Sequence, residues 1–351
     1  MTNQDIALED RIVSAATAAL ELLSIHLGRR LGLYQAVTVP RTPGELAAAA
    51  GIHERYAREW LEQQAVAGLV DVAAPSPKWD ERSYVLTDHH TAVLIDPEHP
   101  AHVAPLADMF AGIAGVLDDV AAAYRTGGGV PYAEYGTIFR NGQAGINRPA
   151  FTHDLVSWLQ AVPDVAARLA EGGKLADLGC GAGWSTIALA TALPHTEVIG
   201  YDSDPASIAD AAANAAERGV DVAFELADAS ALEAHGPFDL VVILEALHDM
   251  ARPAEVLAAA RRALASDGAV LVADEKVADE FTSQGDELER MMYGWSIVHC
   301  LPAALAESPS AAIGTVIRPA MVEALAAEAG FSAVHVSDID AGFFRLYGLR
   351  V

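Results

Sequence analysis

Cysteine is scarce in this chain of 351 residues, which contains only Cys180 and Cys300. Two thiols cannot form the multiple bridges of a disulfide-stapled secreted domain, and such scarcity is typical of a reducing compartment. Basic residues are also few, because 22 Lys and Arg stand against 48 Asp and Glu, a formal net charge of -26. Since nucleic-acid wrapping and adhesion to anionic lipid both need a basic surface, this balance argues against both partners.

The chain also has few long apolar segments. It shows no positive stretch followed by an apolar run near its start, so no signal peptide is expected. No segment approaches the ~18 uninterrupted apolar residues of a membrane span. These absences predict a cytoplasmic protein with no membrane partner.

Apolar residues nevertheless make up 52% of the chain and charged residues 20%, so a sizeable core can form. The length suits about two domains. We expect a mostly helical winged-helix and dimerisation domain over residues 1–100, a helical linker and substrate-lid region over 101–165, and an α/β domain over 166–351.

The N-terminal segment has the pattern of a winged helix. One apolar stripe recurs every three or four residues between 10 and 34, which indicates a long helix. Thr42 to Glu45 forms a capping box with proline at the first helical position, and Gly51 ends that helix. A second helix is expected from about His53 to Ala67, followed by two short strands at 69–72 and 83–86.

This module does not have the charge of a DNA reader. A recognition helix needs basic residues that contact phosphates, but residues 53–64 carry two arginines against three glutamates. Dimerisation or closure over a substrate is therefore favoured over DNA binding. The long N-terminal helix, which has no obvious internal partner, supports a homodimer.

The middle region contains a glycine-rich loop at 127–129 and an aromatic-rich segment after it. Its polar and aromatic side chains either face a ligand or pack against the following domain. The candidates that we name for the substrate are Tyr135, Arg140 and Arg148.

From Lys174 onward, strands alternate with glycine turns and helices, which predicts a parallel, doubly wound sheet. The expected strands are 174–178, 197–201, 222–226, 238–244 and 269–273, and two further strands close the chain. Asp177 ends the first strand, and Gly179, Gly181 and Gly183 follow it in a loop that leads into a helix. Trp184 stands where a dinucleotide fingerprint requires glycine, so that fingerprint is excluded.

Acids follow the next two strands of this sheet. Asp202 is placed to bind a ribose diol, and Asp228 to accept from an adenine amine. The segments ADLGCGAGWST, GYDSDP, ELADA and FDLVVILEALHD resemble the successive motifs of class I S-adenosylmethionine-dependent methyltransferases. The winged-helix module is similar to that of small-molecule methyltransferases which dimerise through it. The cofactor-binding residues that the resemblance implies are Asp177, Gly179, Gly181, Gly183, Asp202, Ser203, Asp228, Ala229 and Glu245.

His248 follows the fourth strand, a position that lies beside the reactive methyl group in this fold. It has two possible roles. As a general base it would take a proton from a hydroxyl group, and the LHD sequence is similar to that of plant-type O-methyltransferases, which use this histidine as the base.

As a metal ligand, His248 would act with Asp249 and His299. A helix over 286–300 could bring His299 back to this position, and two histidines with one carboxylate form a site for a divalent Fe, Zn, Ni or Co ion. The HD pair and YGWSIVHCLP resemble metal-dependent C-methyltransferases that act on the β-carbon of α-keto acids in nonribosomal peptide antibiotic biosynthesis. The resemblance implies a metal-stabilised enolate.

Less specific interpretations remain open at the same residues. His299 could satisfy backbone carbonyls at a helix end, and Asp249 could cap a helix over 250–265. We expect Cys300 to be a small buried apolar residue, because neighbours on an α-helix point in different directions. Tyr293 and Trp295 would line either the core or the pocket, and Arg140, Arg148 and Arg318 are the candidates for binding a substrate carboxylate.

Three hypotheses follow, in this order. The first is C-methylation of a small α-keto acid at a metal site. The second is metal-free O- or N-methylation of a small natural product with His248 as the base. The third is a DNA-binding regulator that senses S-adenosylmethionine.

Overall fold

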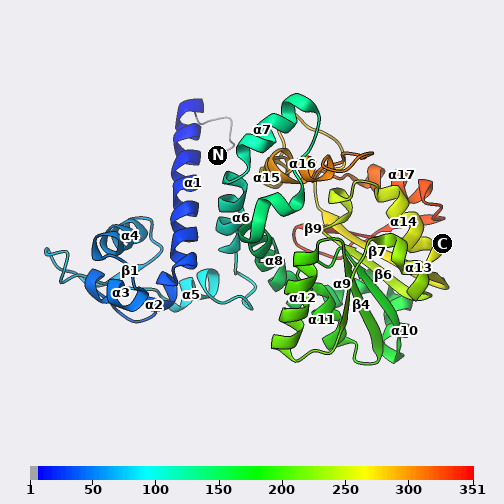
Figure 1. Ribbon diagram of the computed structural model, residues 1–351, viewed down its shortest axis with the longest axis horizontal. Helices are drawn as coiled ribbons and strands as arrows, with labels where there is room; N and C mark the ends of the chain where they lie inside the picture. The colour runs from blue at the N-terminus through cyan, green and yellow to red at the C-terminus, as the bar shows by residue number, and fades with distance from the viewer. Residues whose placement is uncertain (1–6) are drawn as a thin grey trace. The chain divides into compact units, whose positions relative to one another are not determined.

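Seven strands form one twisted sheet in the computed structural model of the protein, which describes residues 7–351 (Figure 1). The strand order is β5-β4-β3-β6-β7-β9-β8. Strands β3 to β7 run parallel to one another, and β9 runs antiparallel to both β7 and β8. Their bounds are β3 Gly173–Leu178, β4 Thr196–Asp202, β5 Ala223–Leu226, β6 Phe238–Leu244, β7 Leu264–Glu275, β8 Ala333–Val336 and β9 Phe344–Arg350.

The α/β class and all five parallel strands predicted from the sequence are confirmed, as is the closing pair. The strand order reverses between β3 and β6. In an open α/β sheet, a crevice forms at such a reversal outside the carboxyl ends of the strands, where ligands bind. Both the glycine loop after β3 and His248 after β6 lie at this point.

Both faces of the sheet are buried, as the side chains of β6 show. Val241 and Ile243 belong to one apolar cluster, whereas Leu240, Val242 and Leu244 belong to another. Successive strand residues point to opposite faces, so a nearly continuous apolar strand fits a sheet covered on both sides. The helices that follow or join these strands are α10 Pro163–Glu171, α11 Trp184–Ala192, α12 Pro205–Arg218, α13 Leu232–His235, α14 Pro253–Arg262 and α17 Pro319–Glu328.

Several short elements complete this second unit, which comprises residues 115–136 and 150–351. One of them, η5 at Ser296–Cys300, is a π-helical turn between two α-helical segments. The others are α7 Leu117–Thr126, η1 Tyr132–Tyr135, α9 Leu155–Trp158, η2 Leu159–Ala161, η3 Ala229–Ala231, η4 Leu247–Asp249, α15 Glu287–Trp295 and α16 Leu301–Ala304.

The first unit contains the winged helix that the sequence predicts. Thr42 and Glu45 form the expected capping box of α3, and Gly51 ends that helix in the left-handed region at φ 67°. The wing strands pair antiparallel. The elements are α1 Leu8–Arg30, α2 Leu33–Ala36, α3 Pro43–Ala50, α4 Glu54–Val66, β1 Asp71–Ala74, β2 Ser83–Val85, α5 Asp88–Leu94, α6 Pro105–Ala114 and α8 Gly136–His153.

The middle region of the sequence does not form one body. Residues up to 114 and 137–149 belong to the first unit, and residues 115–136 and those from 150 onward belong to the second. The segment 101–165, expected as one linker and lid, is therefore divided between the two units. Residues 127–129 do form the predicted loop, and Gly129 lies so close to the backbone of 302–306 that a Cβ there would be 2.1 Å from the Ala306 nitrogen.

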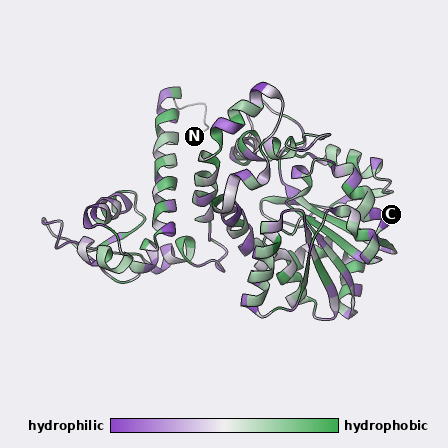
Figure 2. Cartoon of the chain, in the orientation of Figure 1, coloured by the Kyte–Doolittle hydropathy of each residue, from purple (hydrophilic) through white to green (hydrophobic). Residues whose placement is uncertain are grey.

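The long helix α1 exposes apolar side chains. Ile12 is 60% exposed, Leu23 42% and Leu27 50%, and Figure 2 shows the helix mostly in the hydrophobic colour. By length and composition alone, α1 is also apolar enough to cross a membrane. Polar residues interrupt the apolar pattern of α1, so a search for an uninterrupted apolar run does not detect this helix. An exposed apolar face of this kind marks a surface for association.

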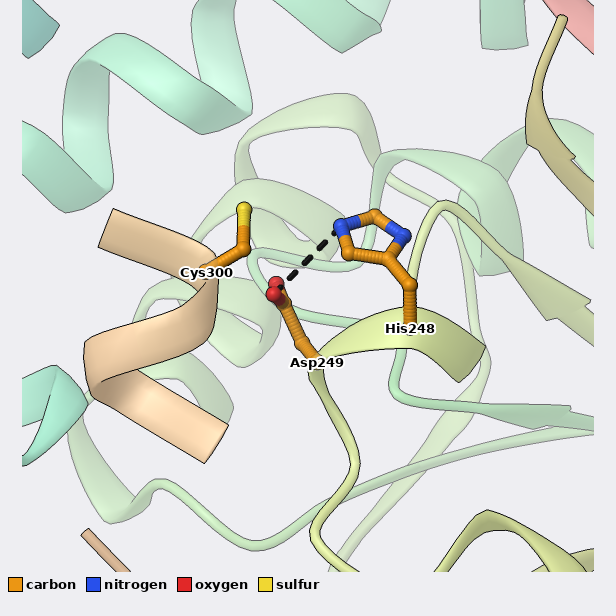
Figure 3. A group of neighbouring side chains, drawn as sticks. All are labelled: His248, Asp249 and Cys300. Carbon is orange, nitrogen blue, oxygen red and sulfur yellow. Dashed lines mark ion pairs between the residues drawn. The ribbon is translucent and has the colours of Figure 1, made fainter. Parts of the chain in front are cut away.

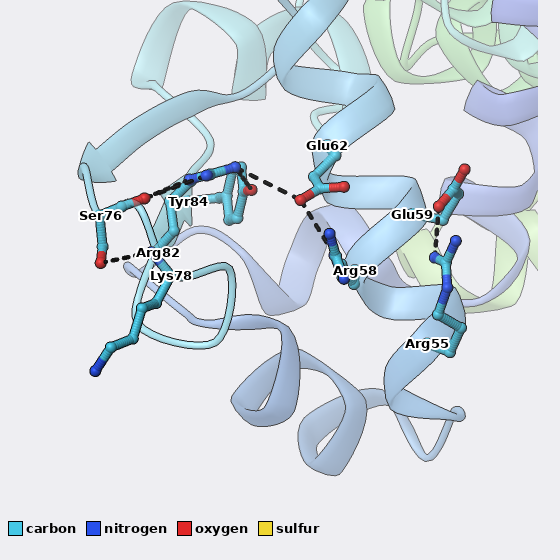
Figure 4. A network of polar contacts seen from close by, with 8 residues as sticks. All are labelled: Arg55, Arg58, Glu59, Glu62, Ser76, Lys78, Arg82 and Tyr84. Atoms are coloured by element: carbon cyan, nitrogen blue, oxygen red, sulfur yellow. Dashed lines mark hydrogen bonds and ion pairs between the residues drawn. The ribbon is translucent and has the colours of Figure 1, made fainter.

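The arginines of helix α4 form ion pairs with glutamates of the same helix (Figure 4). Arg55 pairs with Glu59, and Arg58 pairs with Glu62, which also contacts Arg82 from the wing. These pairs are partly or largely exposed to solvent, and that the winged helix does not read DNA stays a prediction.

Candidate active site

The glycine loop after β3 has a backbone that only glycine adopts easily. Gly179, Gly181 and Gly183 have φ values of 79°, 51° and 79°. A Cβ at Gly179 would lie 2.8 Å from the Cβ of Ala246, whereas nothing lies within 4 Å of the corresponding position at Gly181. The loop thus lets the backbone turn sharply while leaving space on one side for a ligand.

The side chain of Asp177, next to the end of β3, is hydrogen-bonded to the helix that follows this loop. Its Oδ2 accepts hydrogen bonds of 2.6 Å from the hydroxyl groups of Ser185 and Thr186 in the first turn of α11. Burial raises the pKa of Asp177 to about 6, and the two hydroxyl donors oppose that shift. Both described contacts are internal, so Asp177 has the geometry of a positioning residue for the cofactor loop.

Asp202 ends β4 and faces the loop. Its Oδ2 accepts from the Gly181 N–H and its Oδ1 from the Asp204 N–H, both at 2.8 Å. Burial raises the pKa of Asp202, and these backbone donors oppose the rise. Because each carboxylate oxygen has a second lone pair, the fixed carboxylate can still accept from the two hydroxyls of a ribose.

Asp228 follows β5 and caps η3. Its Oδ1 accepts from the Ser230 N–H at 2.8 Å, so this oxygen is fixed within the turn. The hydrogen bonds from Ser230 lower the pKa of Asp228. The other oxygen has no hydrogen bond that ties it to this turn, which suits the predicted contact with an adenine amine. Ala229 is buried beside it, and Ser203 lies in the turn after β4.

Glu245 is the residue directly after β6, and its backbone is strained. It has φ 52°, a conformation that costs a residue other than glycine about 1–3 kcal/mol. Its N–H still donates to the Ala273 carbonyl oxygen at 2.7 Å, so the strain is held by the sheet. Such outliers cluster at functional sites.

His248 lies in η4 and is almost fully buried, with 2% of its surface exposed. Its Nδ1 lies 2.7 Å from the Asp274 Oδ1, and its Nε2 lies 3.3 Å from the Asp249 Oδ1 (Figure 3). Burial alone disfavours the charged imidazolium, but the two carboxylates outweigh it and raise the pKa of His248 well above its usual value. The ring is thus oriented by one carboxylate and faces another.

A second buried acid lies beside this pair. Glu275 is 4% exposed, and burial followed by the charge of Glu245 raises its pKa well above its usual value. Four carboxyl groups, those of Glu245, Asp249, Asp274 and Glu275, therefore act on one another or on the single His248 ring. A site with this charge favours a bound cation.

The π-helical turn brings a thiol to the same place. Nε2 or Nδ1 of His248, a carboxylate oxygen of Asp249 and Sγ of Cys300 all lie within 4.8 Å of one another. Cys300 is buried as expected, and its Sγ also lies near His248 and Asp249, because it stands in a π-helical turn whose wider spacing changes the directions of adjacent side chains. Figure 3 shows the three side chains pointing toward one another from two segments of the chain.

His299, the third ligand expected from the sequence, lies beside Cys300 but is not among the described donors whose atoms lie within 4.8 Å of one another, so the expected set of His248, Asp249 and His299 is not brought together as such. Its Nδ1 is 3.4 Å from the Sγ of Cys300, and it is 2% exposed. Burial lowers the pKa of His299 to about 4, so the imidazole is neutral at physiological pH. The Tyr135 ring packs against it edge to face at 4.6 Å, and the Tyr135 hydroxyl donates to the Val298 carbonyl oxygen at 2.9 Å.

The other substrate candidates have varied surroundings. The Arg318 guanidinium pairs with Glu289 and donates to the Glu280 carbonyl oxygen at 3.0 Å, which fixes it as a structural link. Tyr293 is 39% exposed and its hydroxyl lies 3.4 Å from the same guanidinium, while Trp295 is half-buried. Arg140 and Arg148 lie on the part of α8 that belongs to the first unit, where Arg148 pairs with Glu98.

The structure also decides one alternative that the sequence left open, namely that Asp249 caps a helix. Asp249 caps no helix, because α14 begins at Pro253 after Arg252. Asp274 and Glu275 were not among the residues singled out by sequence reasoning. Their signal was two consecutive acids at the end of an otherwise apolar strand, which is unusual in a buried parallel sheet.

The described residues fit S-adenosylmethionine on structural grounds alone. The loop leaves space at Gly181, the Asp202 carboxylate is fixed beside it, and the carboxylates near His248 suit a cationic sulfonium. All of these groups lie at the carboxyl ends of adjacent strands.

Comparison with known families agrees with this geometry. Residues 169–317 match the model of a methyltransferase domain, and residues 18–95 match that of an Rv2258c-like winged HTH domain. The chain is 37% identical over 105 residues to a ubiquinone biosynthesis O-methyltransferase from Caulobacter sp. strain K31, a match that covers 29% of this chain and 41% of that protein. The chain thus spans about two fifths of the length of the curated relatives it matches.

Solved structures resemble the whole chain. Human N-acetylserotonin methyltransferase in complex with SAM has a TM-score of 0.73 at 16% identity, covering 100% of this chain and 99% of that one. An O-methyltransferase family protein from Burkholderia thailandensis has a TM-score of 0.68 at 17% identity, covering 98% of each. At these identities the likeness shows the fold. The family models match residues 169–317 as a methyltransferase domain and residues 18–95 as a winged HTH domain, and the sheet order and the glycine loop agree with that match.

Proposed function

We propose that the protein is an S-adenosylmethionine-dependent methyltransferase that acts on a small-molecule acceptor. The observation that carries the proposal is one juxtaposition. The glycine loop and Asp202 follow β3 and β4, and the buried His248 follows β6, the strand next to β3. The cofactor, when bound, supplies a methyl group on a positively charged sulfur.

The chain's own residues divide the work between them. Gly179, Gly181 and Gly183 let the backbone approach the methionine part, and Asp202 binds the ribose hydroxyls. Asp228 with Ala229 faces the adenine. His248, held by Asp274, lies at the acceptor side, where its Nε2 either binds a metal or accepts the proton that the acceptor must lose.

For the acceptor, we propose the β-carbon of a small α-keto acid, with a divalent metal held by His248, Asp249 and His299. The burial of both histidines and the excess of carboxyl groups around them support this assignment. A metal there would act as a Lewis acid toward the carbonyl oxygen of the substrate. The β-proton would pass to a neighbouring carboxylate, for which the buried Glu275 with its raised pKa is the candidate, and the electron pair of the C–H bond would make the carbon nucleophile. The neutral His299 has a nitrogen suited to coordination.

Metal-free O- or N-methylation of a small natural product is the second candidate. The His248–Asp274 pair favours it, because a carboxylate at 2.7 Å holds the imidazole through Nδ1 and leaves Nε2 as the nitrogen that would take the acceptor's proton. The names of the relatives, which are O-methyltransferases, favour it as well. A DNA-binding regulator is disfavoured by the internal pairing of the α4 arginines.

A substrate panel with isotopically labelled methyl donor tests these routes. Purified protein is incubated with α-keto acids, phenols and amines, with and without a chelator, and the position of the label is read by mass spectrometry. Label on carbon that disappears with the chelator supports the first route. Label on oxygen or nitrogen that resists the chelator supports the second, and no transfer to any acceptor contradicts the proposed activity.

We also propose that α1 carries the contact of a homodimer, since its apolar stripe is exposed along the helix. The double change Leu23→Glu and Leu27→Glu places charge in that stripe and is expected to give monomers in analytical ultracentrifugation. The matched change Glu9→Gln, at the charged start of the same helix, is expected to leave dimers. A lid role for residues 101–165 and a cytoplasmic location remain predictions.

A further inference from the structure

We infer that Cys300 is a thiolate ligand in a metal site with His248 and Asp249, so that the site binds a borderline transition metal through nitrogen, oxygen and sulfur. The inference deepens the proposed metal-assisted route and rests on it. It changes the predicted ligand set, because the Cys300 thiol takes the place that the sequence assigned to His299 beside His248 and Asp249.

The distances among the donors carry the inference. One ligand atom each from His248, Asp249 and Cys300 lies within 4.8 Å of the other two. Ligands at about 2.0–2.3 Å from a tetrahedral zinc ion are about 3.3–3.8 Å from one another. The three side chains therefore need only small rotations to close around an ion. They come from η4 and η5, two segments that the fold brings together.

The His248 ring is hydrogen-bonded to a further residue, as the metal ligands of proteins usually are. Asp274 binds the Nδ1 of His248 at 2.7 Å, which leaves Nε2 on the side of Asp249. A ligating histidine almost always has such a carboxylate or carbonyl partner, which fixes the ring and makes it a better donor. In the described part of the chain, Asp249 Oδ1 is buried and accepts no hydrogen bond beyond its ion pair with His248.

Cys300 does not have the surroundings of a purely apolar residue. Its Sγ lies 3.4 Å from the His299 Nδ1, and a ring nitrogen of His248 lies within 4.8 Å of the same thiol. Mixed imidazole, carboxylate and thiolate donors select zinc, cobalt or iron over magnesium or calcium. On metal binding, the S–H bond breaks, the sulfur–metal bond forms and one proton leaves to the buffer.

Cobalt(II) titration tests the inference on the full-length protein. Cobalt bound by a thiolate gives a sulfur-to-metal charge-transfer band in the near ultraviolet, which nitrogen and oxygen ligands alone do not give. The chain offers a matched control, since Cys180 is its only other thiol. We compare wild type, Cys300→Ser and Cys180→Ala, with circular dichroism to confirm that each is folded, and measure S-adenosylmethionine binding by calorimetry on the same samples.

The inference predicts the band in wild type and in Cys180→Ala, and its loss in Cys300→Ser. Even changes to residues around metal ligands cost about 10- to 100-fold in metal affinity, so Cys300→Ser is expected to weaken cobalt binding at least that much. Cobalt that binds wild type without the band, and whose binding is lost in His248→Ala, would overturn the thiolate ligand while leaving the metal-assisted route in place.

The failure of the proposed function has a different signature. Absence of any stoichiometric cobalt binding to wild type overturns both the thiolate ligand and the metal-assisted route. Absence of S-adenosylmethionine binding, with the band still present, overturns the methyltransferase activity alone. Since the wild-type spectrum decides the first point by itself, the test does not depend on the folding of Cys300→Ser.

Discussion

The two halves of the candidate site are built in different ways. The donor half consists of the glycine loop, Asp202 and Asp228. Each of them lies at the carboxyl end of a strand or within a few residues of it, and both acids are fixed mainly by hydrogen bonds from backbone N–H groups. The acceptor half consists of side chains from η4, the end of β7 and η5, fixed by contacts with one another. The proposed methyl donor would thus be bound mainly through local backbone geometry, whereas the proposed chemistry of the acceptor depends on side chains that only the fold assembles.

The largest expected effect is the loss of kcat in a His248 variant, which tests whether the acceptor half can be impaired without the donor half. We expect His248→Ala to lower kcat by about 10²–10⁴-fold, the range for losing a group that controls proton transfer. S-adenosylmethionine affinity, measured by calorimetry, should stay within about twofold of wild type because the donor half is untouched. A loss of cofactor binding as large as the loss of kcat would show that the two halves are not separable.

The reverse change weakens the donor half. Asp202→Ala removes the carboxylate that accepts from Gly181 and Asp204, and with it the two hydrogen bonds that we propose to the ribose. At about 1.5–3 kcal/mol for each hydrogen bond to a charged group, we expect the S-adenosylmethionine Kd to rise by about 10²-fold or more. Calorimetry checks this, and cobalt binding at the acceptor half serves as the control that should not change.

Asp274→Asn sharpens the comparison within the acceptor half. The Asp274 carboxylate helps raise the pKa of His248, so an amide at this position lowers that pKa. If His248 must be neutral to accept a proton, the activity of wild type rises as pH passes upward through a raised pKa. The same rise should occur at lower pH in Asp274→Asn. An unchanged pH profile of kcat/KM would contradict this role.

The smallest effect concerns the glycine loop itself. Gly183→Ala places a Cβ at φ 79° and 2.8 Å from both the Phe224 ring and the Ala211 Cβ. We expect a loss of about 1–3 kcal/mol of stability, measured by chemical denaturation. Gly219→Ala, with φ 66° at a helix end and nothing within 4 Å, is the control for the backbone strain alone. Equal losses in the two variants would show that close contact at Gly183 contributes nothing.

The sequence predicted the parallel sheet and the donor half because their signals are local. Apolar runs of strand length, glycines at φ values above zero and an acid near the end of each of β3, β4 and β5 stand close to one another in the chain. Thr42 and Gly51 likewise marked both ends of α3 by local hydrogen bonding. Each of these signals acts over a few residues, so no knowledge of distant contacts was needed.

The acceptor half and the middle region could not be predicted to the same degree. That Cys300 faces His248 depends on a π-helical turn, which no spacing rule for an ordinary helix anticipates. The partnership of His248 with Asp274 depends on two neighbouring strands ending at the same level. Residues 101–165 read as one connecting region, but the packing of α6, α7 and α8 divides them between the two units.

The sequence by itself determined the element types, the sheet and the loop that suits a methyl donor, since short-range backbone preferences and apolar periodicity decide these. The tertiary structure alone decided which acids surround His248 and whether the thiol at 300 joins it. The physical reason is that a buried polar cluster is stabilised by the mutual contacts of side chains from separate segments, and those contacts exist only once the sheet has closed around them.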